Sequence, residues 1–263
     1  MKNSLVAFAL ALSMSGPAFA SPDPDRVDEA FEGVYDLVFD CTASHKCPAE
    51  AGVLKKLVIL GTSKPSLLGS GLGWVVTILN PNTGPAFSFS GATYDAAAYT
   101  IHGNSSGGYG GQIADLILVM DPITGELKGS LDDSLSPGEL TFVAKPVRTV
   151  GTFFQASGDP SPAASIEGQY SGKWANYPSE ILLKDFGTAG FAGKLAILGS
   201  SPIETSFHGG LLEESKGFLT LVGGSNGALL KIFVANHGGT WTGFSVSAEY
   251  GKVSELTLKK SAP

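Results

Sequence analysis

The sequence predicts an all-β protein made of two tandem, duplicated antiparallel domains with about eight strands each. The chain repeats itself: residues 31–35 (FEGVY) return as 166–170 (IEGQY), and residues 125–129 (GELKG) return as 239–243 (GTWTG). A repeat of more than a hundred residues has the size of a domain. Short apolar or alternating segments, broken by Gly, Pro, Asn and Ser, indicate strands. No segment has the pattern of a long amphipathic helix.

The repeated segments predict an up-and-down barrel in each domain, with a two-layer sandwich as the alternative. Consecutive short strands with tight turns form a meander, and eight such strands can close on themselves and remove the exposed edges. The 35 glycines suit the bends and tight turns of small barrels. The repeat also includes the last strand, because residues 139–145 (ELTFVAK) match residues 255–260 (ELTLKK).

The first twenty residues read as a signal peptide. Lys2 supplies a positive charge, residues 5–12 form an apolar run too short to cross a bilayer, and Ala18-Phe19-Ala20 is a cleavage site. The mature chain is expected to begin at Ser21 and to be periplasmic or secreted. No cysteine follows the cleavage site to carry a lipid anchor.

Domain boundaries follow from composition and from the repeat. Residues 21–148 form the first predicted domain, 149–165 a linker with Gly, Ser, Asp and two Pro, and 166–263 the second domain. Phe153 and Phe154 in the linker are expected to cover a barrel end or the contact between the domains, because two adjacent exposed phenylalanines are unfavourable.

The strands can be placed in order, eight in each repeat. Asparagine or aspartate, proline and glycine at residues 80–84 (NPNTG) and 121–125 (DPITG) mark two of the reversals between them. In the first repeat the strands are predicted at 32–39, 53–60, 72–79, 86–90, 98–102, 113–120, 126–131 and 139–145. In the second they are predicted at 167–175, 180–186, 192–198, 204–208, 217–222, 228–235, 240–246 and 253–260.

The charge of the chain argues against nucleic acid and anionic membranes as partners, and the length of its strands argues against a membrane-spanning barrel. The net charge is −7, only 16% of residues are charged, and the densest basic pairs are Lys55-Lys56 and Lys259-Lys260. Nucleic acid and anionic membranes are recognised by clustered Lys and Arg, so neither is an expected partner. Membrane strands need about nine to eleven residues, and most of the predicted strands are shorter, so the chain is not expected to span a membrane as a barrel.

The two cysteines, Cys41 and Cys47, predict one disulfide. An even cysteine count in an exported chain is typical of a disulfide, and this short loop would stabilise the fold by about 2.4 kcal/mol on a chain-entropy model. The alternative is a metal site that adds His45. Zinc thiolate sites generally use four ligands, and the chain has no second cysteine pair.

An aromatic set on the second repeat is the best candidate for a ligand site. Tyr170 and Trp174 lie four residues apart on the first strand of that repeat and therefore face the same way, and Trp241 lies on its seventh strand. The first and eighth strands of such a barrel pair, so the first and seventh are close. These three residues either line the mouth of a cavity or plug the barrel end as core.

Gly172-Lys173-Trp174 is similar to the opening motif of lipocalins, and the meander resembles the calycin and avidin-like barrels. The motif is three residues wide and covers one strand of one repeat. The resemblance implies a barrel that holds a small ligand.

No residue pattern points to catalysis, to a metal or to a cofactor. His102, His208 and His237 each precede a glycine and read as ordinary turn residues. Asp132-Asp133 and Glu213-Glu214 are adjacent, so each pair points to opposite faces of a strand. Residues 69–73 (GSGLG) precede a strand and not the helix that a nucleophile elbow needs.

The sequence thus favours an exported, non-catalytic binding protein that holds a small apolar or amphipathic ligand in one of two barrels. The alternative is a periplasmic or cell-surface interaction protein with filled barrels, which presents loops such as 64–71 and 105–111 to a protein partner. An outer-membrane barrel is the least favoured class.

Overall fold

The computed structural model describes most of the chain from Glu29 onward. The described residues are 29–40, 54–61, 74–80, 82–95, 97–106, 113–121, 124–133, 136–163, 165–185, 191–198, 203–214, 216–225 and 228–261. The predicted signal peptide, the predicted Cys41–Cys47 disulfide, His45 and the loop 64–71 lie outside them, as does most of the loop 105–111.

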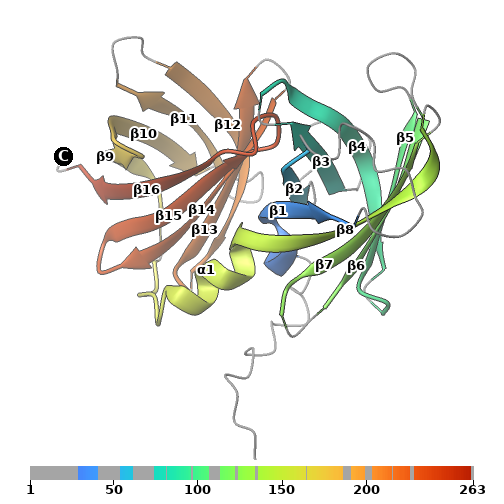
Figure 1. Ribbon diagram of the computed structural model, residues 1–263. Helices are drawn as coiled ribbons and strands as arrows, with labels where there is room; N and C mark the ends of the chain where they lie inside the picture. The colour runs from blue at the N-terminus through green and yellow to red at the C-terminus, as the bar shows by residue number, and fades with distance from the viewer. Residues whose placement is uncertain are drawn as a thin grey trace, which may run out of the picture.

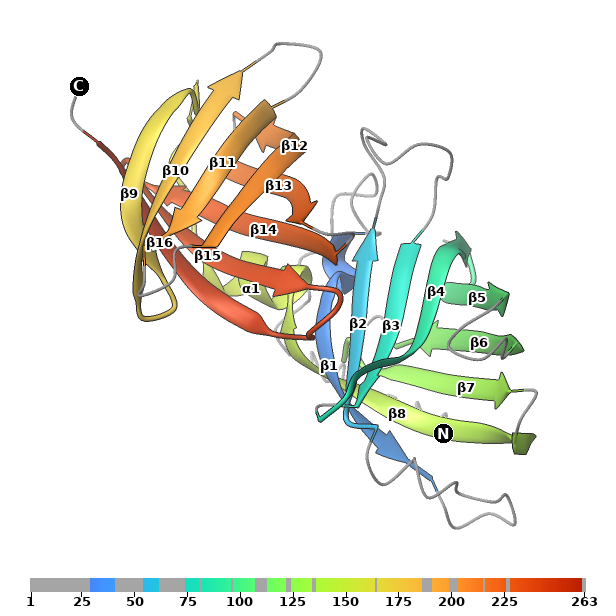
Figure 2. The same ribbon diagram turned by 90° about the horizontal axis from the view of Figure 1, so that it is seen from above.

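Both domains are closed antiparallel barrels of eight strands, which confirms the barrel and excludes the sandwich (Figures 1 and 2). A short 3-10 turn, Glu29–Phe31, precedes barrel one. Barrel one contains β1 (Gly33–Phe39), β2 (Lys56–Gly61), β3 (Trp74–Asn80), β4 (Gly84–Asp95), β5 (Thr100–Ser106), β6 (Ile113–Met120), β7 (Leu127–Asp133) and β8 (Ser136–Thr149). Barrel two contains β9 (Gly168–Trp174), β10 (Tyr177–Asp185), β11 (Phe191–Ile197), β12 (Ile203–Glu213), β13 (Phe218–Ser225), β14 (Ala228–His237), β15 (Thr240–Ser247) and β16 (Val253–Lys260).

Each barrel closes by pairing its first strand with its last. β1 pairs with β8 and β9 with β16, and every other strand pairs with its neighbours in sequence. The meander predicted from the spacing of the strands is therefore the observed topology. β4 and β12 are twelve and eleven residues long, more than twice the five residues predicted for each, because pairing continues beyond their apolar centres.

A tyrosine marks the start of both barrels and supports the duplication. The Tyr35 hydroxyl donates a hydrogen bond to the carbonyl of Phe31 at 2.7 Å, and the Tyr170 hydroxyl donates to the carbonyl of Ile166 at 2.9 Å. Both tyrosines are buried and lie four residues after the carbonyl that they bind. The same local structure thus opens both copies.

The sequence match between the two last strands is wrong by two residues. Gly129 lies opposite Phe142 on β8, and its counterpart Gly243 lies opposite Leu256 on β16. Phe142 and Leu256 are therefore equivalent, whereas the matched letters pair Leu140 with Leu256. A shift of two residues keeps every side chain on the same face of the strand, so alternation cannot detect it.

The first half of the predicted linker is a short helix, α1 (Val150–Ala156). Thr149 is both the last residue of β8 and the N-cap of α1. Its hydroxyl accepts a hydrogen bond from the Thr152 amide at 3.2 Å, and the Thr152 hydroxyl accepts one from the Thr149 amide at 3.1 Å. This reciprocal capping starts the helix directly at the strand end. In the described part of the chain, no helix is long and apolar enough to cross a membrane.

A third apolar core lies between the barrels, in addition to the one inside each. Val58 and Leu60 from the outer face of β2 contact this core, as do Phe233 and Phe244 from the outer faces of β14 and β15. Phe153 of α1 is 4% exposed and packs edge-on against Phe244, with 5.4 Å between ring centroids. Phe153 thus covers the domain contact as predicted; the side chain of Phe154 lies outside the described set.

Candidate functional site

The predicted aromatic set lies inside barrel two. Tyr170, Trp174 and Trp241 are 3%, 9% and 4% exposed and belong to one apolar core. β16 connects their strands, because Leu258 lies opposite both Gly172 and Trp241. The first and seventh strands are therefore close, as expected from the barrel.

A small cavity adjoins two of these three residues. It has a volume of about 10 Å³, and its wall contains Tyr170 and Trp241 but not Trp174. The rest of the wall is aliphatic: Leu183, Leu219, Leu221, Ile232, Val234 and Leu258. Such a volume holds about one water molecule, whereas ligand pockets span about 300–1,000 Å³. This cavity among the described side chains of barrel two is therefore too small for an organic ligand.

Aromatic rings fill barrel one against glycines of its own wall. A methyl group placed on Gly129 would lie 2.2 Å from the ring of Phe142, and one on Gly103 would lie 3.0 Å from Phe89. Phe89 and Phe142 belong to the core of this barrel with Tyr35 and Trp74. The glycines thus leave the space that the rings occupy.

The two tyrosines that open the barrels are held in the neutral form. Burial, and secondarily the carboxyl of Glu32, raises the pKa of Tyr35 far above its ordinary value of 10.0. Burial also raises the pKa of Tyr170. Each hydroxyl therefore acts as a fixed hydrogen-bond donor within the core and not as an acid or base near neutral pH.

A buried ion pair joins the two barrels. Lys231 on β14 of barrel two bonds through Nζ to the carboxylate of Glu32, just before β1, and to the carbonyl of Gly61 at 3.0 Å. The side chains of Lys231 and Glu32 are 5% and 2% exposed. Nζ also lies 5.3 Å from the ring centroid of Phe233. Two charges of opposite sign thus stand inside the apolar contact between the barrels.

A concave site of about 270 Å³ lies outside both barrels, in a cleft between barrel two, α1 and the end of β8. Polar and charged groups converge there from β8, from the residue after α1, and from β14, β15 and β16, in line with ligand sites at domain interfaces. Its lining contains Arg148, Ser157, His237, Thr242, Glu255 and Thr257, with Phe153, Ala156, Gly243 and Leu256 between them.

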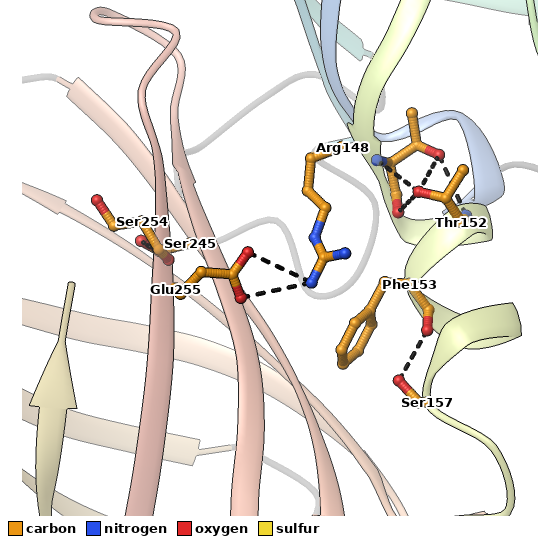
Figure 3. Close-up of polar contacts among 8 residues, drawn as sticks. Arg148, Thr152, Phe153, Ser157, Ser245, Ser254 and Glu255 are labelled. Carbon is orange, nitrogen blue, oxygen red and sulfur yellow. Dashed lines mark hydrogen bonds and ion pairs between the residues drawn. The ribbon is translucent and has the colours of Figure 1, made fainter.

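Arg148 dominates this cleft (Figure 3). Its guanidinium carbon lies 5.7 Å from the ring centroid of Phe153 and 5.1 Å from that of Phe244. Nη2 reaches both oxygens of Glu255 at 3.4 Å, a long contact for an ion pair. Among the described residues, Arg148 Nε has no hydrogen-bond partner. The guanidinium is therefore oriented by two rings and only loosely held by its carboxylate.

The remaining candidates do not gather. His102 on β5 is exposed, His237 lines the cleft, and the side chain of His208 lies outside the described set. Over the described ranges, no three His, Cys, Asp or Glu side chains form a group that could hold a metal ion.

The described fold and site define a tandem-barrel protein, an architecture that also serves binding proteins. No model of a protein family matches the chain, and no curated protein matches it. A solved structure from Nostoc punctiforme, described as a protein of unknown function from the DUF3598 family, is similar to it. The match covers 89% of this chain and 98% of that chain, with 9% identity and a TM-score of 0.25.

Sequence reasoning missed Lys231, Glu32 and Arg148. A signal for Lys231 was present, because it is the single charged residue in the apolar run 229–235 (LLKIFVA). A charge inside such a run indicates a buried, paired group. Nothing in the sequence near Arg148 indicates its partners, which lie on another element and in the other domain.

Proposed function

We propose that this protein is an exported, non-catalytic binding protein whose ligand contacts the cleft between the barrels. The observation that carries the proposal is the contrast in volume between the cleft, about 270 Å³, and the cavity inside barrel two, about 10 Å³. The predicted signal peptide supports export. Determination of the N-terminal residue of the mature protein checks it, with Ser21 as the expected result.

The chemistry of the cleft favours a small amphoteric molecule that carries a carboxylate and an ammonium group. Arg148 offers a planar fork that suits a carboxylate, and Glu255 offers a carboxylate that suits an ammonium group. Their own ion pair is long and exposed, and such pairs contribute at most about 1 kcal/mol. A ligand with both charges would replace one weak internal pair with two pairs of its own.

Calorimetric titration of the mature protein tests this proposal, with glycine, serine, glutamate and lysine compared with lactate and ethanolamine. Saturable binding of an amino acid, weakened about tenfold or more in Arg148→Lys and Glu255→Gln, is expected because the first change removes the bidentate fork and the second removes the anionic partner. Glu204→Gln is the matched control, since Glu204 forms an exposed pair with Lys194 on barrel two. Equal binding of lactate, or no heat with any amino acid, would contradict the proposal.

A second candidate is a small apolar ligand inside barrel two, at Tyr170, Trp174 and Trp241. The cavity beside Trp241 favours it, because ligand binding there needs only an enlargement of existing apolar space. Titration with fatty acids, sterols and small aromatic compounds should then shift the tryptophan fluorescence. The shift should disappear in Trp174→Ala and Trp241→Ala and persist in Trp74→Ala. Equal losses in all three variants would argue against this placement.

A further inference from the structure

The contact between the barrels is made by two different faces. Barrel one contributes the outer face of β1–β3, and barrel two contributes the outer face of β14 and β15. Because the barrels share one topology, each also carries a counterpart of the face that the other uses. These counterparts are β6 and β7 of barrel one, which match β14 and β15, and β9–β11 of barrel two, which match β1–β3. Figure 2 shows β6, β7, β9 and β10 on the far sides of the molecule.

The first free face is the outer face of β6 and β7, and strand register identifies its residues. Leu118 lies opposite Gly129 in barrel one, as Val234 lies opposite Gly243 in barrel two. Counting from these pairs, Asp115 occupies the position of Lys231, and Ile117 that of Phe233. Ser130 and Asp132 on β7 occupy the positions of Phe244 and Val246. Asp115, Ile117 and Asp132 are exposed, whereas their counterparts are buried.

The second free face is the outer face of β9 and β10, and the tyrosines that open the two barrels fix its residue correspondence. Tyr170 lies opposite Ile181 as Tyr35 lies opposite Leu57, so Leu182 and Lys184 correspond to Val58 and Leu60. One residue and three residues before Tyr170, Gln169 and Glu167 correspond to Val34 and Glu32. All four side chains on this face are exposed.

We propose that these two free faces match the halves of the internal contact in strand position, and that their polar and charged side chains prevent a second copy of this chain from docking there. Two different faces that bind one another form an interface that does not close by symmetry, so repeated docking would give open chains. The internal contact is the template, with the exception of α1, which has no described counterpart after β16.

Charge decides the outcome at the centre of this contact. Where Lys231 pairs with Glu32 inside the molecule, Asp115 of one copy would meet Glu167 of the next. Like charges brought together in an interface cost several kcal/mol and suppress an otherwise matching partner. Apolar contact is smaller as well, because Ser130 stands at the position of Phe244 and Lys184 stands at the position of Leu60. The wild-type chain therefore remains single.

The test restores one face in each of two variants and mixes them. The first variant carries Asp115→Lys, Ser130→Phe and Asp132→Val; the second carries Gln169→Val and Lys184→Leu. All five positions face outward on paired strands, and circular dichroism checks the fold of each variant. In sedimentation velocity, the wild type is expected as a single chain and the equimolar mixture as a species of twice that mass.

A matched control separates charge from apolar area. A first variant that keeps Asp115 but carries Ser130→Phe and Asp132→Val should bind the second variant at least tenfold more weakly, because Asp115 still faces Glu167. A mixture that sediments as single chains would overturn the proposal. Equal binding with and without Asp115→Lys would overturn the role of charge. Association of the wild-type protein into dimers or longer chains would show that its polar side chains do not prevent docking.

Discussion

Replacement of Lys231 by methionine is expected to lower the free energy of unfolding by about 3–5 kcal/mol, because it leaves the Glu32 carboxylate buried without its cation. Methionine is an unbranched apolar side chain only one atom shorter than lysine, so the change removes the charge beside Phe233 with little loss of volume. Chemical denaturation monitored by circular dichroism measures the loss. The expected effect exceeds that of most single substitutions.

A double variant distinguishes the cost of leaving one buried charge unpaired from the effect of removing both charges. Lys231→Met combined with Glu32→Leu removes both charges, so most of the lost stability should return, as is common when apolar residues replace a buried pair. Lys56→Met is the control, because Lys56 forms an exposed pair with Asp36 and its removal should cost less than about 1 kcal/mol. Equal costs at Lys231 and Lys56 would show that the buried pair contributes no more than a surface pair.

Truncation of Trp241 to alanine is expected to cost about 3–5 kcal/mol, the range for large aromatic side chains in cores. Trp241 already borders the cavity of about 10 Å³, so its removal would join that cavity to the space of the missing indole ring. Apolar cavities of this kind stay dry and bind small aromatic molecules. Added indole should therefore raise the midpoint of thermal unfolding in Trp241→Ala and leave the wild type unchanged.

This experiment also decides between a filled and a hollow barrel two. If Trp241 closes the mouth of a natural ligand cavity, its truncation should cost little stability and abolish ligand binding. If it is core, the stability falls and indole restores part of it. Tyr177→Ala is the matched control, because Tyr177 is an aromatic residue of the same barrel that is 57% exposed. A cost below about 1 kcal/mol for Trp241→Ala would contradict the filled interior.

Strand count, strand order and barrel closure could be predicted because they depend on local patterns. Turn residues such as those at 80–84 mark reversals, and β1 and β16 show the alternation of a strand with one buried face. In β2, however, Leu57 and Ile59 face the interior while Val58 and Leu60 face barrel two. Such a continuous apolar run indicates burial on both faces but does not tell which face lies inside.

The candidate site was less accessible to sequence reasoning, for a physical reason. Tyr170 and Trp241 were brought together correctly, because their strands are close in any closed meander of eight strands. Whether they enclose a ligand or fill the space depends on fractions of a side-chain volume, and the same residue types serve both roles. The cleft around Arg148 joins a strand end, a helix and the other domain, so no local pattern encodes it.

The buried pair has a consequence for the order in which the protein is made. Glu32 and Lys231 are separated by 199 residues. At about 5–20 residues per second, roughly 10–40 s of synthesis pass between them. During that interval barrel one can close, while Glu32, Val58 and Leu60 still lack the partners that cover them. Newly made barrel one thus presents a charged and apolar face that a holding chaperone could protect until barrel two arrives.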